Sequence, residues 1–137
     1  MKTFFDSSAF AKRYIDETGS NRVEIICRES QALGLSVLCA PEIISALNRR
    51  KREKSISARQ YKLARQRLFE EISDADIINL TDMVIADAIK ILEKNAIKTL
   101  DALHISCAVS WNADLFVSSD KRQLDAARKV RLRTEEV

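Results

Sequence analysis

Short apolar segments alternate with longer amphipathic ones along almost the whole 137-residue chain. This alternation restricts the fold more than any other feature, because strands separated by helix-length connections favour an α/β fold with a parallel sheet. We predict five strands: Lys2–Phe5, Leu33–Leu38, Asp76–Leu80, Leu115–Ser118 and Val130–Leu132. With two glycines, one proline and no internal repeat or linker, residues 1–137 are expected to form a single domain.

The segments between these strands carry apolar residues at helical spacing. We expect four long helices: Pro41–Lys54, Ala58–Ile72, Thr81–Lys94 and Thr99–Trp111. Ser57 is a suitable N-cap for the second, and the start of the first lies between Ser36 and Pro41, since proline is tolerated in a first helical turn. The apolar stripe expected to face the sheet in the third helix consists of Ile85, Ala88, Ile89 and Leu92.

The cysteines and the distribution of apolar residues bear on the cellular compartment. Cys27, Cys39 and Cys107 are odd in number and widely spaced, so we expect reduced thiols in the core rather than disulfides or a cysteine-based metal site. Asp6 interrupts any signal-peptide core, and no apolar run approaches the roughly 20 residues of a membrane span. We expect a cytoplasmic protein without a membrane partner.

The formal net charge of +3 is modest, but the cations are concentrated in the segment from Arg49 to Arg67. Such a run can bind phosphate groups, because each cation that neutralises a phosphate releases counterions. Arg49, Arg50 and Arg52 are therefore candidate RNA-binding residues. The alternative is that the segment is simply the solvated face of a helix.

Acidic residues follow two of the predicted strands directly. Asp6 follows the first strand and Asp120 the fourth, and Glu42 lies near the start of the helix after the second strand. In an open parallel sheet ligands bind beyond the carboxyl ends of the strands, so these acids are expected at one edge. The position of Asp101 does not follow from spacing alone. Each acid, taken singly, is also a residue that the first turn of a helix favours.

Converging carboxylates require compensation. Two of them about 5 Å apart repel by about 3 kcal/mol at an effective dielectric near 20, so several such pairs need protonation or a bound cation. Oxygen ligands without histidine or cysteine partners favour Mg²⁺ or Mn²⁺. The acids therefore indicate a hard-metal site.

Four blocks of the sequence, in order, resemble the PIN-domain family and in particular its stand-alone VapC-like toxins. The blocks are Phe4–Phe10, Pro41–Leu47, Thr99–Ser106 and Asp114–Arg122. The resemblance covers essentially the whole chain. It implies a three-layer sandwich with a central parallel sheet of four to five strands flanked by helices.

The resemblance also implies the chemistry and the partners. Asp6, Glu42 and Asp101 would be the main metal-site acids and Asp120 a more variable fourth, all of them catalytic, with Ser8 and Ser118 supporting the site. The activity would be Mg²⁺- or Mn²⁺-dependent endoribonuclease cleavage of RNA. A small antitoxin would block the site with an arginine or lysine, partly over the helix expected at Ser8–Ile15, and the chain would form a homo-oligomer, such as a dimer.

Three alternatives remain open from the sequence. The only histidine, His104, lies on one helical face with Asp101, but a lone histidine beside Leu103 and Ile105 is more often packed than catalytic. A second alternative is a catalytically silent module that holds RNA or protein. The third is a receiver-like domain phosphorylated on aspartate, which also gathers acids at strand ends.

Overall fold

A five-stranded, entirely parallel sheet forms the centre of the computed structural model, which describes all 137 residues. Its strands are β1 Lys2–Phe5, β2 Ala32–Ser36, β3 Asp76–Ile78, β4 Leu115–Ser118 and β5 Thr134–Glu136. Their order across the sheet is β3-β2-β1-β4-β5. The chain therefore builds outward from β1 to β3 on one side and then crosses β1 to add β4 and β5 on the other. The order reverses between β1 and β4, where ligands bind in open α/β sheets.

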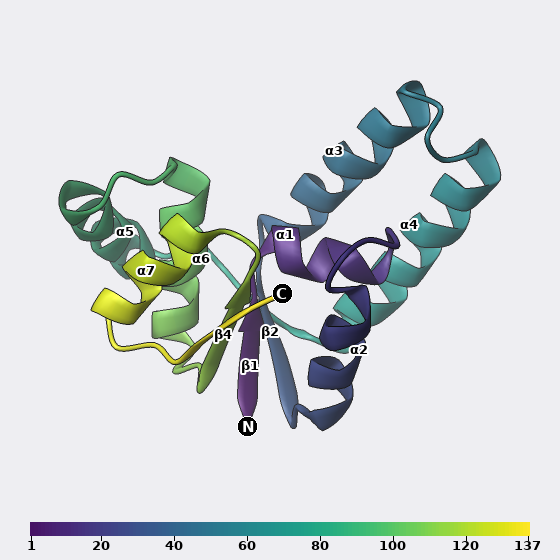
Figure 1. Cartoon of the computed structure of the whole chain (residues 1–137). Helices are drawn as coiled ribbons and strands as arrows, with labels where there is room; N and C mark the ends of the chain where they lie inside the picture. Colours follow the sequence, from purple (N-terminus) through teal and green to yellow (C-terminus); the bar gives the residue numbers. More distant parts are fainter.

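Helices cover both faces of this sheet. They are α1 Ser7–Phe10, the 3₁₀ helix η1 Ala11–Arg13, α2 Ser20–Glu29, α3 Cys39–Arg52, α4 Ala58–Ser73, α5 Asp82–Lys94, α6 Thr99–Ser110 and α7 Lys121–Lys129. Figure 1 shows α1 to α4 on one side of the strands and α5 to α7 on the other. The predicted three-layer α/β sandwich is confirmed. The strand order also excludes the receiver-like alternative, whose order is 2-1-3-4-5.

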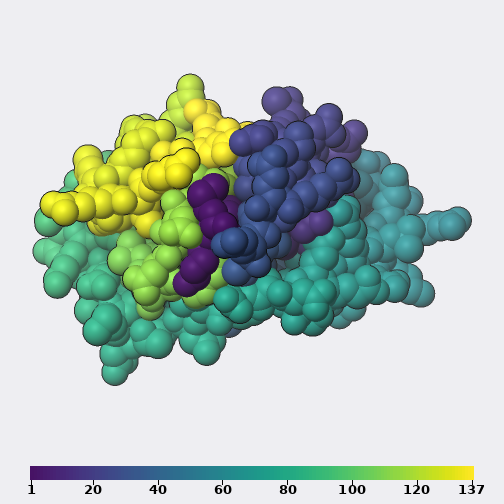
Figure 2. All heavy atoms as spheres, turned by 90° about the horizontal axis from the view of Figure 1, so that it is seen from below, coloured from purple at the N-terminus to yellow at the C-terminus, as the bar shows by residue number.

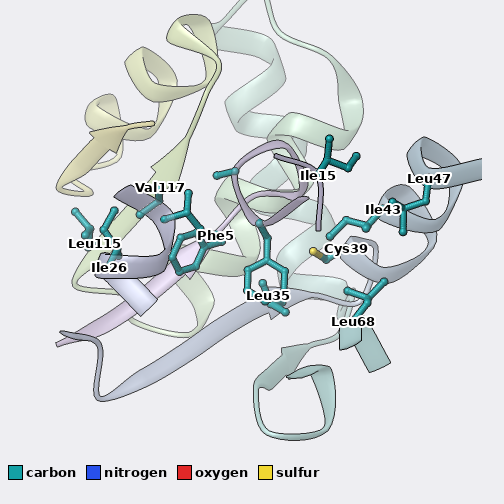
Figure 3. Close-up of a cluster of buried hydrophobic side chains, with 13 residues drawn as sticks. Phe5, Ile15, Ile26, Leu35, Cys39, Ile43, Leu47, Leu68, Leu115 and Val117 are labelled. Atoms are coloured by element: carbon teal, nitrogen blue, oxygen red, sulfur yellow. The ribbon is translucent and has the colours of Figure 1, made fainter. Parts of the chain in front are cut away.

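The alternation of side chains along the strands divides the core into two parts. Phe5, Leu35 and Val117 point to the helices α1 to α4 and belong to a cluster of 13 buried residues, ten of which are labelled in Figure 3. Phe4 and Phe116 point to the opposite face, where their rings stack at 5.9 Å between centroids. Burial on both faces explains why these strands read as continuous apolar runs.

On the face covered by α5 to α7, the middle residue of β2 is a glycine. A Cβ built on Gly34 would lie 2.6 Å from a ring carbon of Trp111, the residue that caps the C-terminus of α6. The absence of a side chain on Gly34 lets the indole lie directly on the strand. The ring is held there by a hydrogen bond from Nε1 to Asp76 and by the ammonium of Lys2, 4.3 Å from the ring centroid.

Helices α3 and α4 form a hairpin, and local residue preferences explain where these two helices begin and end. Helix α3 begins at Cys39, which places Pro41 in the first turn, where its missing N–H costs nothing. It ends before Lys54, which adopts a left-handed φ of 60°. Ser57 caps α4 with a capping box to Gln60, as predicted. Figure 1 shows this hairpin extending away from the sheet.

Three predictions of local structure are wrong. The segment Val130–Leu132 is not a strand: Val130 caps α7, and the fifth strand is the polar edge segment Thr134–Glu136. The helix expected over Ser8–Ile15 ends at Phe10, and a 3₁₀ turn follows it. In α5 the buried stripe is Val84, Ala88 and Ile91, whereas Ile85 and Ile89 are 40% and 53% exposed.

The amino ends of the strands form the edge seen in Figure 2, where the first residues lie between the segments that precede β2 and β4. Backbone bonds of 3.0 Å from Gln31 to Met1 and 2.8 Å from Asp114 to Lys2 tie these segments together. All three cysteines are free, with Cys39 and Cys107 buried as expected. None of the helices has the length and apolar character needed to cross a membrane.

Candidate active site

The four acids singled out in the sequence lie on elements that meet at the carboxyl edge of the sheet. Asp6 directly follows β1 and caps α1, and Asp120 caps α7 just beyond β4. Glu42 and Asp101 lie in the first turns of α3 and α6. The edge is the one where the strand order reverses, between β1 and β4.

Asp6 is the most deeply held of the four, with 3% of its surface exposed. Its carboxylate accepts hydrogen bonds from the hydroxyl of Ser8 at 2.8 and 2.9 Å, from the N–H of Ala9 at 2.9 Å, and from the hydroxyl of Ser118 at 2.9 Å. Ser8 and Ser118, to which the resemblance assigns support of the site, thus both donate to Asp6. Burial raises the pKa of Asp6, although these bonds and the nearby His104 oppose the shift.

Glu42 is held by two side chains that the sequence pattern does not place in the site. Its Oε1 atom lies 2.5 Å from Nε2 of His104 and accepts a 2.7 Å hydrogen bond from the hydroxyl of Ser7. Burial alone would raise the pKa of Glu42. The hydrogen bonds from His104 and Ser7, together with the positive charge that the His104 ring carries when protonated, outweigh burial, and the pKa lies below its ordinary value. The ionised form of Glu42 is therefore favoured.

The negative charges of Asp101 and Asp120 lie close enough to interact. Asp101 is half-buried, and its pKa is raised first by burial and then by the negative charges of Asp120 and Glu42. Asp120 is exposed and accepts bonds from the N–H groups of Arg122 and Gln123. Asp101 is therefore close enough to Asp120 and to Glu42 to be repelled by both, which is the condition that a bound cation relieves.

Buried Gln123 joins the elements that carry these acids. Its side-chain oxygen lies 2.8 Å from the hydroxyl of Ser118, and its nitrogen donates to the backbone oxygen of Asp101 at 3.2 Å. Ser118 also accepts the N–H of Asp120 at 3.0 Å. One network thus connects the end of β4 to the starts of α6 and α7.

The donor set suits a hard divalent cation, although the side chains do not surround one. All four acids offer oxygen, and neither Oε2 of Glu42 nor the carboxylate of Asp101 takes part in a hydrogen bond. No group of three acidic, histidine or cysteine side chains is arranged to hold a metal ion. Mg²⁺ commonly uses one or two carboxylates and keeps several waters, so these residues fit such a site.

The basic candidates lie away from the acids, along the α3 and α4 hairpin. Arg49, Arg50 and Arg52 occupy the last turns of α3, about 10 to 15 Å along the helix from Glu42 at 1.5 Å per residue. Arg49 and Arg52 form no ion pair, whereas Arg50 lies 3.5 Å from Glu17. The structure does not bring these three cations together with the acids.

Sequence reasoning did not single out Ser7 and Gln123, and it weighed His104 but favoured a packed role for it. A pattern signal existed for His104, which lies three residues after Asp101 and so on the same helical face. Ser7 follows Asp6 directly and has no comparable signal, because only the packing of α1 against α3 brings it to Glu42. Burial of His104, at 2% exposure, agrees with the packed interpretation, but its ring also makes a polar contact.

Comparison with known proteins gives a consistent result. Residues 3–129 match a family model described as "PIN domain". A search of curated proteins found no significant sequence match.

Among solved structures, a DNA-bound VapBC from Salmonella typhimurium has a TM-score of 0.72 and 15% identity, covering 99% of this chain and 98% of that one. VapC20 of Mycobacterium tuberculosis, described as a sarcin-ricin loop cleaving toxin, has a TM-score of 0.70 and 15% identity, covering 90% and 94%. FitAcB of Neisseria gonorrhoeae has a TM-score of 0.70 and 12% identity, covering 96% and 95%. At such identities the likeness shows the fold.

Proposed function

Because the chain belongs to the PIN-domain family, we propose that it is a metal-dependent endoribonuclease and the toxin of a toxin–antitoxin pair. The observation that carries the proposal is that the elements bearing Asp6, Glu42, Asp101 and Asp120 begin or end at the carboxyl edge of the sheet, where the strand order reverses. The likeness to toxin structures that include an RNA-cleaving protein supports it.

In this proposal Asp6, Glu42 and Asp101 bind Mg²⁺ or Mn²⁺, and Asp120 assists. A bound cation of this kind activates water and offsets the charge of a phosphate in phosphodiester hydrolysis. The residues of the chain hold the acids in place: Ser8 and Ser118 fix Asp6, and Gln123 ties Ser118 to the start of α6. Asp101, which burial and its neighbours bias toward protonation, and Asp6 are both candidates for the general base.

The test is cleavage of RNA by the wild-type chain with Mg²⁺ or Mn²⁺ and with excess EDTA. We expect new RNA ends only when the metal is present, because four uncompensated acids at one edge repel a phosphate. Equal cleavage in EDTA would contradict the proposed metal requirement. RNA binding without cleavage under any metal condition would instead support the alternative of a catalytically silent RNA-binding module.

We further propose that the basic end of α3 holds RNA phosphates. Neutralising Arg49, Arg50 and Arg52 together should weaken RNA binding and lower the slope of log affinity against log salt by about one for each phosphate that is no longer neutralised. The measurement is a salt titration with an Asp6→Asn background that prevents cleavage. A matched control neutralises Arg28, Arg131 and Arg133, which lie outside the α3 and α4 hairpin. If both triple variants give the same slope of log affinity against log salt, the basic end of α3 is only a solvated helical face.

The proposed partner is a small antitoxin that inserts an arginine or lysine among the acids. Arginine suits this position because its planar fork bonds carboxylates bidentately and stays charged. The structure narrows the surface expected at the early helices: Phe10 and Ile15 are buried in the core, which leaves Ala11 and Tyr14 partly exposed. The similar Salmonella structure is that of a VapBC complex.

The antitoxin proposal predicts that expression of the chain alone slows growth and that co-expression with the neighbouring small open reading frame restores it. The small protein should also co-purify with the chain. An Asp6→Asn variant serves as the control and should be harmless by itself. Equal growth with wild type and variant, and no co-purifying protein, would remove the toxin role and leave the nuclease proposal standing.

A further inference from the structure

One oxygen of the Glu42 carboxylate is held by two hydrogen-bond partners while the other is free. Oε1 lies 2.5 Å from Nε2 of His104 and 2.7 Å from the Ser7 hydroxyl, and these two partners are 3.2 Å from each other. Oε2 takes part in no hydrogen bond. A carboxylate anchored in this way at one oxygen presents a fixed second oxygen, which is the arrangement that outer-shell hydrogen bonds give to metal-binding acids.

The surroundings of His104 favour one tautomer. The ring is 2% exposed, and its Nδ1 atom is buried without a hydrogen-bond partner. Nδ1 lacks a partner in either tautomer and so does not decide between them. The carboxylate oxygen Oε1 can only accept a hydrogen bond, however, so Nε2 needs a hydrogen to bond it. In the neutral ring the single hydrogen therefore belongs on Nε2, directed at Glu42.

The contact also connects the two helical layers. Glu42 belongs to α3 on one side of the sheet and His104 to α6 on the other. Helix α6 thus supplies Asp101 and, one turn later, the residue that contacts Glu42. A histidine that merely filled space among Leu103 and Ile105 would not need this bond across the edge of the sheet.

We propose that His104 is a positioning residue that, together with Ser7, orients Glu42 so that Oε2 is available to the metal ion. The inference rests on the proposed function, because it assigns Glu42 to a metal site. It gives His104 no contact with substrate and no proton transfer. Its role is to fix the direction of one acid.

Metal affinity in the absence of RNA tests the inference separately from catalysis. We expect His104→Leu, which keeps apolar volume but no donor, to weaken Mn²⁺ binding by about 10- to 100-fold, the usual effect of losing an outer-shell partner. His104→Gln, whose side-chain amide can donate to Oε1, should recover part of the affinity. Ser7→Ala should weaken it less than His104→Leu, because the shorter bond from His104 remains.

The matched control is Ser106→Ala, which removes another buried α6 hydrogen bond, from the Ser106 hydroxyl to the backbone oxygen of Val84. Mn²⁺ binding is measured by calorimetry on each folded variant, with thermal unfolding alongside. Affinity lowered in His104→Leu, partly restored in His104→Gln and unchanged in Ser106→Ala supports the inference. Wild-type affinity in a folded His104→Leu overturns it.

A second measurement needs no variant. His104 is the only histidine of the chain, so its imidazole nitrogens give unambiguous signals in ¹⁵N NMR of the untagged wild-type protein. A hydrogen on Nε2 supports the inference, and a hydrogen on Nδ1 alone overturns it. Wild-type protein that binds no Mn²⁺ overturns the proposed function and this inference together, whereas Mn²⁺ binding with the wrong tautomer overturns the inference alone.

Discussion

Asp6→Asn is expected to lower the rate of RNA cleavage by more than about 100-fold while leaving the fold intact. Losing an outer-shell partner of a metal site already costs about 10- to 100-fold, and Asp6 is proposed as a direct ligand. Asparagine keeps an oxygen for the N–H of Ala9 and an amide that can face Ser118, so the surrounding network survives. Single-turnover cleavage at saturating Mg²⁺ is the measurement.

The same substitution should hold or raise the melting temperature. Burial raises the pKa of Asp6, so its ionised form weakens folding once the pH exceeds the ordinary pKa, and asparagine removes that charge. Asp101→Asn should likewise lower the cleavage rate without lowering the melting temperature. Substitution of the exposed Asp120 should lower the cleavage rate less. The matched control is Asp125→Asn on α7, where the carboxylate bonds only Arg128. Cleavage at the wild-type rate by Asp6→Asn would contradict the assignment of Asp6 to the site.

The second large effect concerns stability. Gly34→Val is expected to lower the free energy of unfolding by about 1 to 3 kcal/mol, the usual cost of overpacking a filled core. The new side chain would meet the ring of Trp111, which Asp76 and Lys2 hold in place and which therefore cannot easily move. For a chain of this size each kcal/mol corresponds to about 4 °C in melting temperature.

A double-mutant cycle distinguishes this clash from a general effect on the strand. Trp111→Ala removes the obstructing ring and has its own cost, but combined with Gly34→Val the two losses should be less than additive, because the valine then occupies space left by the indole. Chemical denaturation of the four proteins gives the coupling. Strict additivity would show that Trp111 is not what excludes a side chain at Gly34.

The fold was predictable from the sequence where local residue preferences and tertiary packing favour the same secondary structure. Strands β1 and β4 are buried on both faces, so their apolar runs coincide with the observed bounds. The N-cap Ser57 is followed three positions later by Gln60, which completes its capping box. Strand β5, by contrast, is polar and lies at the sheet edge, so its pairing with β4 leaves no apolar pattern, whereas the apolar Val130 and Leu132 pack outside any strand.

The prediction of which face of α5 is buried was wrong for a related reason. The helix has apolar residues on more than one face, so periodicity alone cannot decide which stripe is buried, and the structure chooses the one that includes Val84. In the site, the positions of the strand-end acids follow from parallel topology. The contacts of Ser7 and His104 with Glu42 do not, since they depend on side chains from three helices meeting across the sheet edge.

The crossing from β3 over β1 to β4 has a consequence for the synthesis of the protein. Thr3 pairs with Leu115, so the central strand of the sheet lacks its partner on one side until more than 100 further residues have been synthesised. Asp6 and Asp120 are likewise brought together only when β4 and the start of α7 have been translated. A nascent chain of the proposed nuclease thus lacks a complete acidic centre until the residues of β4 and α7 have been added.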